Sequence, residues 1–112
     1  MKKIILRSAI AISLCTAANV WAGGDIAAGK AASATCTSCH GAEGVSAAAL
    51  YPHIGGQYES YLLRSLRRYK SGERQNAIMQ GMVAGLSDDD MENLAAYYAS
   101  LTGVLKDGTV KP

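Results

Sequence analysis

The sequence predicts a small all-α domain. Two segments repeat apolar residues at three-and-four spacing, and no stretch alternates apolar and polar residues as a half-buried strand does. Once an N-terminal leader is set aside, about 90 residues remain, which suits one domain with a modest core. The chain has no Phe, and its single Trp lies in the leader. Because so thin a core needs a supplement, we expect a bound group to complete it.

Residues 1–22 have the pattern of a secretory signal peptide. A basic start precedes a short apolar run and a small-residue exit at Val20-Trp21-Ala22; the basic residues are Lys2, Lys3 and Arg7. The apolar run is too short to be a persuasive membrane span. We therefore predict a signal peptide over 1–22, a folded domain over 23–103 and a C-terminal tail over 104–112. The mature protein is expected in the periplasm, free or loosely attached to the membrane, with no integral membrane segment.

Removal of the leader changes the charge and the cysteine count. The whole chain has 11 Lys plus Arg and 9 Asp plus Glu, and three of the basic residues lie in the leader. The mature chain is therefore close to neutral, which gives no support to a nucleic-acid role. Cys15 is also lost, which leaves two cysteines. A lipidated Cys15 is the alternative, but Leu14 stands where that signal usually has a small residue.

The first helix is predicted over residues 25–37, with Asp25 as its N-cap and many alanines. At its end lies Cys36-Thr37-Ser38-Cys39-His40, a C-x-x-C-H motif typical of covalent haem attachment. Thiols three positions apart on a helical turn reach the two vinyl groups of one porphyrin, and His40 follows as the proximal iron ligand. The motif predicts one haem c, bound through Cys36 and Cys39.

The two cysteines have three other interpretations. A zinc site needs a second pair of Cys or His ligands, which the chain does not supply. A thioredoxin-like dithiol needs a strand-to-helix setting and no histidine, and the chain has no βαβ pattern. A structural disulfide is the third alternative. Two cysteines left after cleavage are the number that one haem consumes.

A loop and a second long helix follow the motif. Residues 41–57 hold four glycines and one proline, which predicts a loop. Residues 58–70 predict an amphipathic helix that Ser71-Gly72 ends; its apolar positions are Tyr58, Leu62, Leu66 and Tyr69.

The last helix begins at Ser87, where Asp90 completes a capping box. Its apolar face is formed by Met91, Leu94, Ala95, Tyr98 and Leu101, and Gly103 is expected to stop it. Residues 73–86 are predicted to be a connection between these two helices. This connection is where a second iron ligand should be sought.

Methionine sulfur is the ligand that the connection offers. A thioether is soft and neutral, and it raises the potential of haem iron. Met91 lies on the apolar face of the last helix, where a core role is expected. Met79 and Met82 remain, and their spacing alone does not separate them.

The order of these elements resembles the class I c-type cytochromes, and in detail the bacterial subclass four (cytochrome c4-like), whose members usually carry two such domains. The matching strings are Cys-Thr-Ser-Cys-His-Gly-Ala-Glu-Gly, Tyr51-Pro-His-Ile-Gly-Gly-Gln57, Tyr61-Leu-Leu-Arg-Ser-Leu, Lys70-Ser-Gly-Glu-Arg and Met79-Gln-Gly-Met-Val-Ala-Gly-Leu-Ser-Asp. The resemblance implies a small class I fold of about four helices packed around one covalently bound haem. Only one such domain is present here.

The resemblance also implies roles for particular residues. It places the second axial ligand at Met79, with Met82 packing near the ring. It makes the carbonyl of Pro52 the hydrogen-bond acceptor for the second ring nitrogen of His40. Gly29 matches the place where the first and last helices cross, beside Tyr97 and Tyr98.

Several polar residues have two interpretations each. His53 is either a surface histidine or an alternative iron ligand. Gln57, Tyr61 and Arg64 either hydrogen-bond the haem propionates or belong to the core and the surface. A basic face is either solvated or a docking patch for an acidic redox partner; it comprises Arg64, Arg67, Arg68, Lys70 and Arg74.

The sequence supports three functional hypotheses. The first is a carrier of single electrons, not an enzyme, between a donor dehydrogenase or quinol-oxidising complex and an acceptor oxidase or reductase, with iron held by His40 and Met79. The second is the electron-accepting haem subunit of a periplasmic dehydrogenase, such as flavocytochrome sulfide dehydrogenase. The third, a peroxidase, would need an open iron position and a polar distal group.

Overall fold

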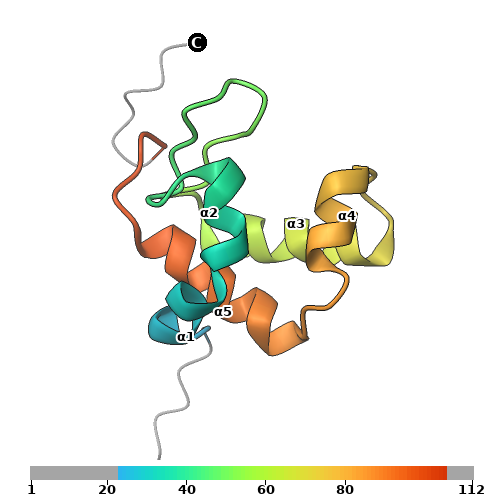
Figure 1. The fold of residues 1–112 in the computed structure, drawn as a ribbon. Coiled ribbons are helices and arrows are strands. Elements are labelled where there is room, and N and C mark those ends of the chain that lie inside the picture. Colours follow the sequence, from blue (N-terminus) through green and yellow to red (C-terminus); the bar gives the residue numbers. More distant parts are fainter. Residues whose placement is uncertain (1–22, 106–112) are drawn as a thin grey trace, which may run out of the picture.

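The computed structural model describes residues 23–105, so the predicted signal peptide, Cys15 and most of the predicted tail lie outside it. The part described contains five α-helices and no strand, which confirms the all-α prediction with one helix more than expected (Figure 1). The helices are α1 (Ile26–Ala32), α2 (Ala34–His40), α3 (Glu59–Ser71), α4 (Ala77–Val83) and α5 (Asp88–Ser100).

The N-terminal helical segment differs from the prediction because it is broken at Ser33. Asp25 caps α1 as expected, since its Oδ1 accepts from the N–H groups of Ala27 at 2.8 Å and Ala28 at 3.0 Å. The Ser33 hydroxyl then donates to the Lys30 carbonyl at 2.8 Å, and a serine that bonds its own preceding turn competes with helix continuation. The predicted single helix over 25–37 is therefore wrong. The C-x-x-C-H motif lies inside a second helix, α2, whose C-cap is Gly41.

Residues 73–86 are also not the plain connection that was predicted, because they contain α4. Gly81 suggested a loop, since glycine inside a helix costs about 1 kcal/mol relative to alanine. Two local features offset that cost. The Asn76 side chain accepts from the Met79 N–H at 3.0 Å and caps the helix, and Val83 is almost fully buried at its other end.

The two long helices begin and end close to their predicted limits. Tyr58 is the N-cap of α3 and is 81% exposed, so it does not belong to the buried face that was predicted for it. Gly72, with φ of +80°, ends α3 in the left-handed conformation that glycine favours. The capping box of α5 is present, because Ser87 and Asp90 each accept a backbone N–H of the other. Helix α5 ends at Ser100, earlier than Gly103.

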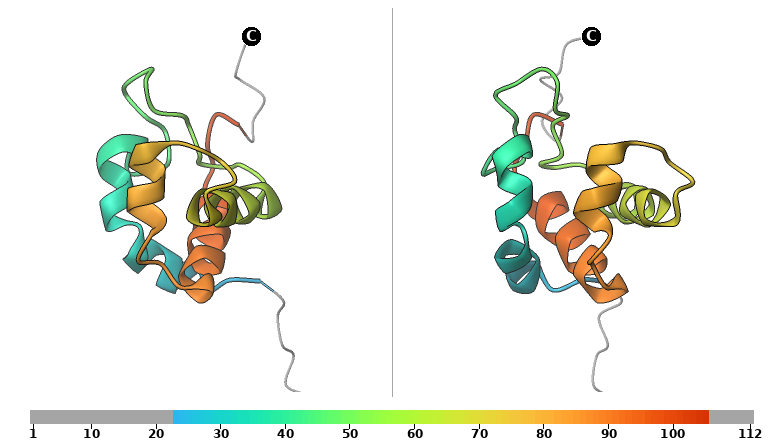
Figure 2. Two further views of the ribbon diagram at one scale, coloured as in Figure 1. Left: turned by 90° about the vertical axis from the view of Figure 1, so that its right-hand side faces the viewer. Right: turned by 45° about the vertical axis from the view of Figure 1, so that its right-hand side comes forward.

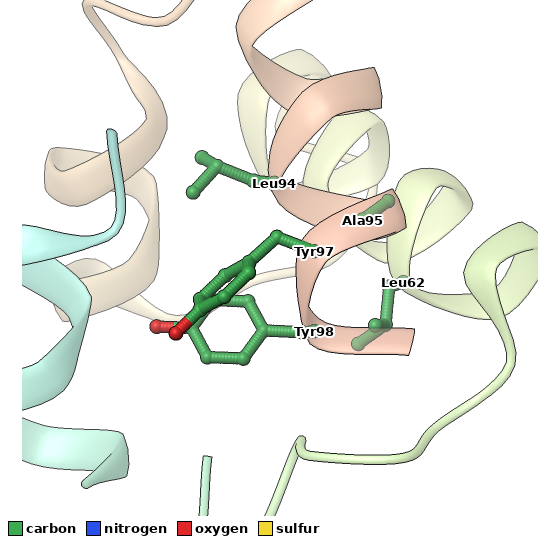
Figure 3. Close-up of a cluster of buried hydrophobic side chains, with 5 residues drawn as sticks. All are labelled: Leu62, Leu94, Ala95, Tyr97 and Tyr98. Carbon is green, nitrogen blue, oxygen red and sulfur yellow. The ribbon is translucent and has the colours of Figure 1, made fainter. Parts of the chain in front are cut away.

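The core is built around α5, which packs against α1 on one side and α3 on another. Figure 3 shows the cluster of Leu62, Leu94, Ala95, Tyr97 and Tyr98. Tyr97 and Ala96 are buried in addition to the predicted face, because neighbours cover α5 from more than one direction. Among the five helices, α2 packs closely on α1 alone, and α4 packs closely on α3 alone. The helices that carry the candidate ligands therefore pack less extensively on the other helices than α1 and α3 do.

The first and last helices cross at Gly29, as the resemblance implied. A Cβ atom on Gly29 would lie 2.0 Å from the Asn93 carbonyl oxygen and 2.8 Å from the Tyr97 Cβ. The Asn93 side chain also accepts from the Asp25 N–H at 2.6 Å. The absent side chain thus lets α1 approach α5 closely enough to fix where α2 begins.

Candidate haem-binding site

Helix α2 presents both cysteines and the histidine of the motif. Cys36 and Cys39 are half-buried free thiols, so the structure does not join them in a disulfide. Cys36 packs against the core cluster, and burial raises the pKa of its thiol. In the described segment no group of three or more His, Cys, Asp or Glu side chains is placed to hold a metal ion. No further side chain of these types is therefore placed with Cys36 and Cys39 to hold zinc in the described segment.

His40, at the end of α2, is held in one orientation by a loop residue. Its side chain is buried, and Nδ1 donates to the Pro52 carbonyl at 2.8 Å. A carbonyl only accepts, so the ring proton lies on Nδ1 and the lone pair of Nε2 is left free. This is the state that a histidine needs to bind iron through Nε2, with a second hydrogen bond that fixes its ring.

The loop that carries Pro52 is tied to the end of α5. The Gly44 carbonyl accepts from the N–H groups of Ile54 at 2.8 Å and Gly55 at 2.9 Å, and the Gly56 N–H donates to the Tyr98 carbonyl at 2.8 Å. Gly103 packs so tightly on this loop that a Cβ atom there would lie 1.9 Å from the Gly55 oxygen. Both views of Figure 2 show the loop beside the chain that leaves α5. Gly103 therefore anchors the loop rather than ending the helix.

Met79 and Met82 both lie on α4, which stands apart from α2 in Figure 1. Met79 is half-buried, whereas Met82 is 40% exposed. The cap at Asn76 bonds the backbone of Met79 itself, so the start of α4 fixes the position of that residue. Met79 is therefore the less exposed of the two methionines, and its backbone is the one that the cap holds.

A buried polar atom beside the cysteines is left without a partner. The Tyr98 hydroxyl is buried and makes no hydrogen bond of standard geometry among the described residues, although the Ser33 hydroxyl and the Cys36 sulfur are its polar neighbours. Burial, and then the neighbouring Cys36 sulfur, raise the pKa of this hydroxyl. Figure 3 shows the rings of Tyr97 and Tyr98 extending to the same side of α5. Free cysteines, a free Nε2 and an unpaired hydroxyl next to Cys36 together fit a large group bound at α2.

The remaining predicted site residues serve the loop and α3. The Gln57 side chain accepts from the Tyr58 N–H at 2.8 Å, which supports the start of α3. Tyr61 is 41% exposed, and the Arg64 guanidinium lies 6.0 Å from the centre of its ring. His53 is exposed and accepts the Ser46 N–H at 3.0 Å through Nδ1. Ser46 has no local sequence pattern that would predict this contact.

Most of the basic face on α3 is compensated by neighbouring groups. Arg67 forms ion pairs with Asp88 at 3.4 Å and Glu92 at 2.9 Å. Arg68 pairs with Glu73 at 3.1 Å, and the Lys70 ammonium donates to the Leu86 carbonyl. These contacts tie α3 to α5 and to the segment before it. Their presence favours the interpretation of this face as a solvated surface with local partners.

The fold and the site together define a c-type haem protein. The cytochrome c family matches residues 26–102, so the chain belongs to that family of haem proteins of electron transport. In the part of the chain that the structure describes, no helix has the length and apolar character needed to cross a membrane.

Named relatives refine this assignment. The chain is 41% identical to cytochrome c4 of Pseudomonas aeruginosa over 89% of its own length and 49% of the relative. It is 44% identical to cytochrome c-554(548) of Halomonas halodenitrificans over 69% of its length and 96% of the relative. The solved structure of reduced cytochrome c4 from Pseudomonas stutzeri superposes with a TM-score of 0.69 at 40% identity, over 71% of this chain and 47% of that one. The chain thus spans about half the length of the cytochrome c4 relatives.

A further relative has a name that mentions an enzyme. The chain is 43% identical to a thiosulfate dehydrogenase electron acceptor of Thiomonas intermedia, over 67% of its own length and 35% of the relative.

Proposed function

We propose that the mature protein is a periplasmic carrier of single electrons with one haem c, ligated by His40 and Met79. The observation that carries this proposal is His40 itself, which is buried, is held through Nδ1 by Pro52 and has Nε2 free. The bound haem supplies one-electron oxidation and reduction of its iron. The protein breaks no bond in a substrate, so it is not an enzyme in its own right.

Each functional residue has a separate task. Cys36 and Cys39 form the thioether bonds that attach the haem to α2. The Nε2 atom of His40 binds the iron, while the Pro52 carbonyl keeps the ring from rotating and raises its donor strength. Met79 offers a neutral sulfur from α4, a ligand that suits both oxidation states of the iron. The half-buried side chains around Cys36 keep water away from that part of the site.

The location and the number of haems rest on the sequence. The leader over 1–22 supports export, and the two cysteines of the mature chain suffice for one haem. The match over 96% of cytochrome c-554(548) supports a single domain of this kind. We infer a donor dehydrogenase or quinol-oxidising complex and an acceptor oxidase or reductase as partners.

Replacement of Met79 by alanine tests the ligand assignment. Met79→Ala should lower the reduction potential by on the order of 0.1 V and let imidazole or cyanide bind the iron, because axial ligands tune haem over about 0.8 V. Spectroelectrochemical titration and ligand titration measure both effects. Met82→Ala, in the same helix, is the matched control and should behave like the wild type. An unchanged Met79→Ala protein beside an altered Met82→Ala protein would move the assignment to Met82.

A second candidate function is the electron-accepting subunit of a dehydrogenase. The name of the Thiomonas relative favours it, and it shares the same haem site. Capture of partners from the native periplasm and membrane fraction with the intact haem protein separates the two candidates. Stoichiometric recovery of one dehydrogenase would indicate a subunit. Transient partners that exchange in salt would indicate a free carrier.

A further inference from the structure

The loop over residues 41–57 is closed by backbone hydrogen bonds from Ile54 and Gly55 to the Gly44 carbonyl and, nearer its tip, by one side-chain contact. Ser46 lies on the leg that leaves α2, and His53 lies on the leg that returns toward α3. The Ser46 N–H donates to His53 Nδ1 at 3.0 Å. Residues 47–50, between the two legs, are exposed, so the intervening segment has little packing to hold its shape. The contact between Ser46 and His53 therefore holds the two legs together beyond the backbone hydrogen bonds at Gly44.

Ser46 also connects the loop to the peptide that precedes the proximal histidine. Its side chain is buried, and its Oγ lies 2.9 Å from the Cys39 carbonyl oxygen and 3.0 Å from that of Ala48. The same Oγ accepts the Ala48 N–H at 3.1 Å. The Cys39 carbonyl belongs to the peptide unit that joins Cys39 to His40. Ser46 thus touches the backbone of His40's own turn through its hydroxyl and touches His53 through its amide.

His53 acts on the other side of the same histidine. The Pro52 carbonyl that accepts from His40 Nδ1 belongs to the peptide unit that joins Pro52 to His53. Fixing the His53 ring on Ser46 limits rotation of that peptide unit, and so limits where the carbonyl points. His40 is therefore held at its backbone by the Ser46 hydroxyl and at its ring by the Pro52 carbonyl. Both contacts depend on Ser46, because Ser46 also binds His53.

We propose that His53 is a positioning residue for His40, acting through Ser46 and the Pro52 carbonyl to set the donor strength of the proximal ligand. This inference rests on the proposed ligation of haem iron by His40. Because Ser46 donates, the acceptor nitrogen Nδ1 of His53 carries no proton, and its proton lies on Nε2. The role needs an acceptor at the Nδ1 position of residue 53 and does not need an imidazole ring.

The direction of the effect follows from the hydrogen bond at His40. A well-aligned Pro52 carbonyl draws the Nδ1 proton and makes Nε2 a stronger donor, which favours ferric iron. A looser loop weakens this bond, so the potential should shift to a more positive value when the His53 acceptor is removed.

The test compares three variants of the intact haem protein. His53→Ala removes the acceptor, His53→Asn keeps an acceptor oxygen at nearly the same position, and Leu50→Ala truncates an exposed side chain of the same loop as the matched control. The reduction potential and the hydrogen exchange of the Ser46 and His40 Nδ1 protons are measured together. His53→Ala should exchange the Ser46 amide about tenfold faster and shift the potential positively. His53→Asn and Leu50→Ala should stay close to the wild type in both measurements.

Two results would overturn the inference. One is a His53→Ala protein whose exchange rates and potential match the wild type. The other is a potential that shifts equally in His53→Ala and His53→Asn, since this would trace the effect to the ring and not to the acceptor. A different experiment tests the proposed function itself. If His40 does not ligate the haem iron, His40→Ala should keep an unchanged low-spin spectrum.

Discussion

Tyr98 carries a buried hydroxyl that lacks a well-formed hydrogen bond in the segment described. This hydroxyl lies beside Ser33 and Cys36, but neither contact has standard hydrogen-bond geometry. Burying such a group without a partner costs on the order of 1 to 3 kcal/mol. The ring, in contrast, contributes to the core, and it lies 5.0 Å from the ring of Tyr97. The packing of the Tyr98 ring thus offsets the unfavourable free energy of burying its hydroxyl.

The raised pKa of Tyr98 predicts an alkaline loss of stability. Above about pH 10 the unfolded chain releases the tyrosine proton while the folded chain retains it, so the free energy of unfolding falls by up to about 1.4 kcal/mol per pH unit. Below about pH 10 the contribution is fully present. Tyr98→Phe should remove this part of the slope, as measured by urea unfolding between pH 8 and about 11.5.

Tyr58→Phe is the matched control for this measurement. Its ring is 81% exposed, so the variant should retain the wild-type slope. An identical alkaline slope in Tyr98→Phe and the wild type would rule out Tyr98 as its source.

At the scale of elements, the crossing of α1 and α5 sets the geometry of the site. Helix α1 approaches α5 at Gly29, and α2 follows after the break at Ser33. The Asn93 side chain on α5 also binds the Asp25 backbone before α1 begins. The direction in which α2 presents Cys36 and Cys39 therefore depends on a contact that neither cysteine makes.

Substitution at this crossing should destabilise the protein. Gly29→Ala places a methyl group against the Asn93 backbone, and overpacking of this kind typically costs about 1 to 3 kcal/mol. The free energy of unfolding of the haem protein measures the loss.

Gly81→Ala is the matched control because Gly81 also lies within a helix. A Cβ atom there meets nothing within 4 Å, so the variant should be unchanged or up to about 1 kcal/mol more stable. If Gly29→Ala and Gly81→Ala had the same free energy of unfolding, close packing of α1 on α5 at Gly29 would not contribute to stability.

The sequence predicts the ends of a helix well where the capping residues lie within one turn of that end. The capping box at Ser87, the cap at Asp25 and the glycine end of α3 each depend on residues within one turn. Helix α4 is not predicted by local pattern because its glycine favours a loop, whereas the Asn76 cap and the burial of Val83 stabilise a helix. The break at Ser33 was missed because a serine within an alanine-rich run does not by itself predict a back-bond.

For the whole molecule, the small core explains why the cofactor matters. The buried hydrophobic residues of the described chain lie mainly on α5, and α2 and α4 each pack closely on a single helix. Small domains often need a staple beyond their own apolar core. A haem attached through α2 and ligated from α4 would join the two helices that the protein packing leaves least supported.

Removal of the haem should therefore loosen α2 and α4 selectively. A Cys36→Ala/Cys39→Ala variant, isolated without haem, should lose amide protection in these helices and retain more of it in α5 at its contacts with α1 and α3. Hydrogen exchange with residue resolution measures the difference. Ser38→Ala, which keeps both cysteines, is the control. Uniform protection or uniform loss along the haem-free chain would show that the helices unfold as one unit.

The sequence by itself determined the cofactor, through C-x-x-C-H, and the helices whose caps and ends are local in the chain. It also placed two candidate methionines in one segment, and the family resemblance selected Met79 and implied the Pro52 carbonyl as the partner of His40. The tertiary structure decided what depends on residues far apart along the chain. These features are the packing of Gly29 on α5, the burial of Tyr98 beside Cys36 and the contact of His53 with Ser46. Such contacts have no periodicity and no spacing to read, because only the closed fold brings their partners together.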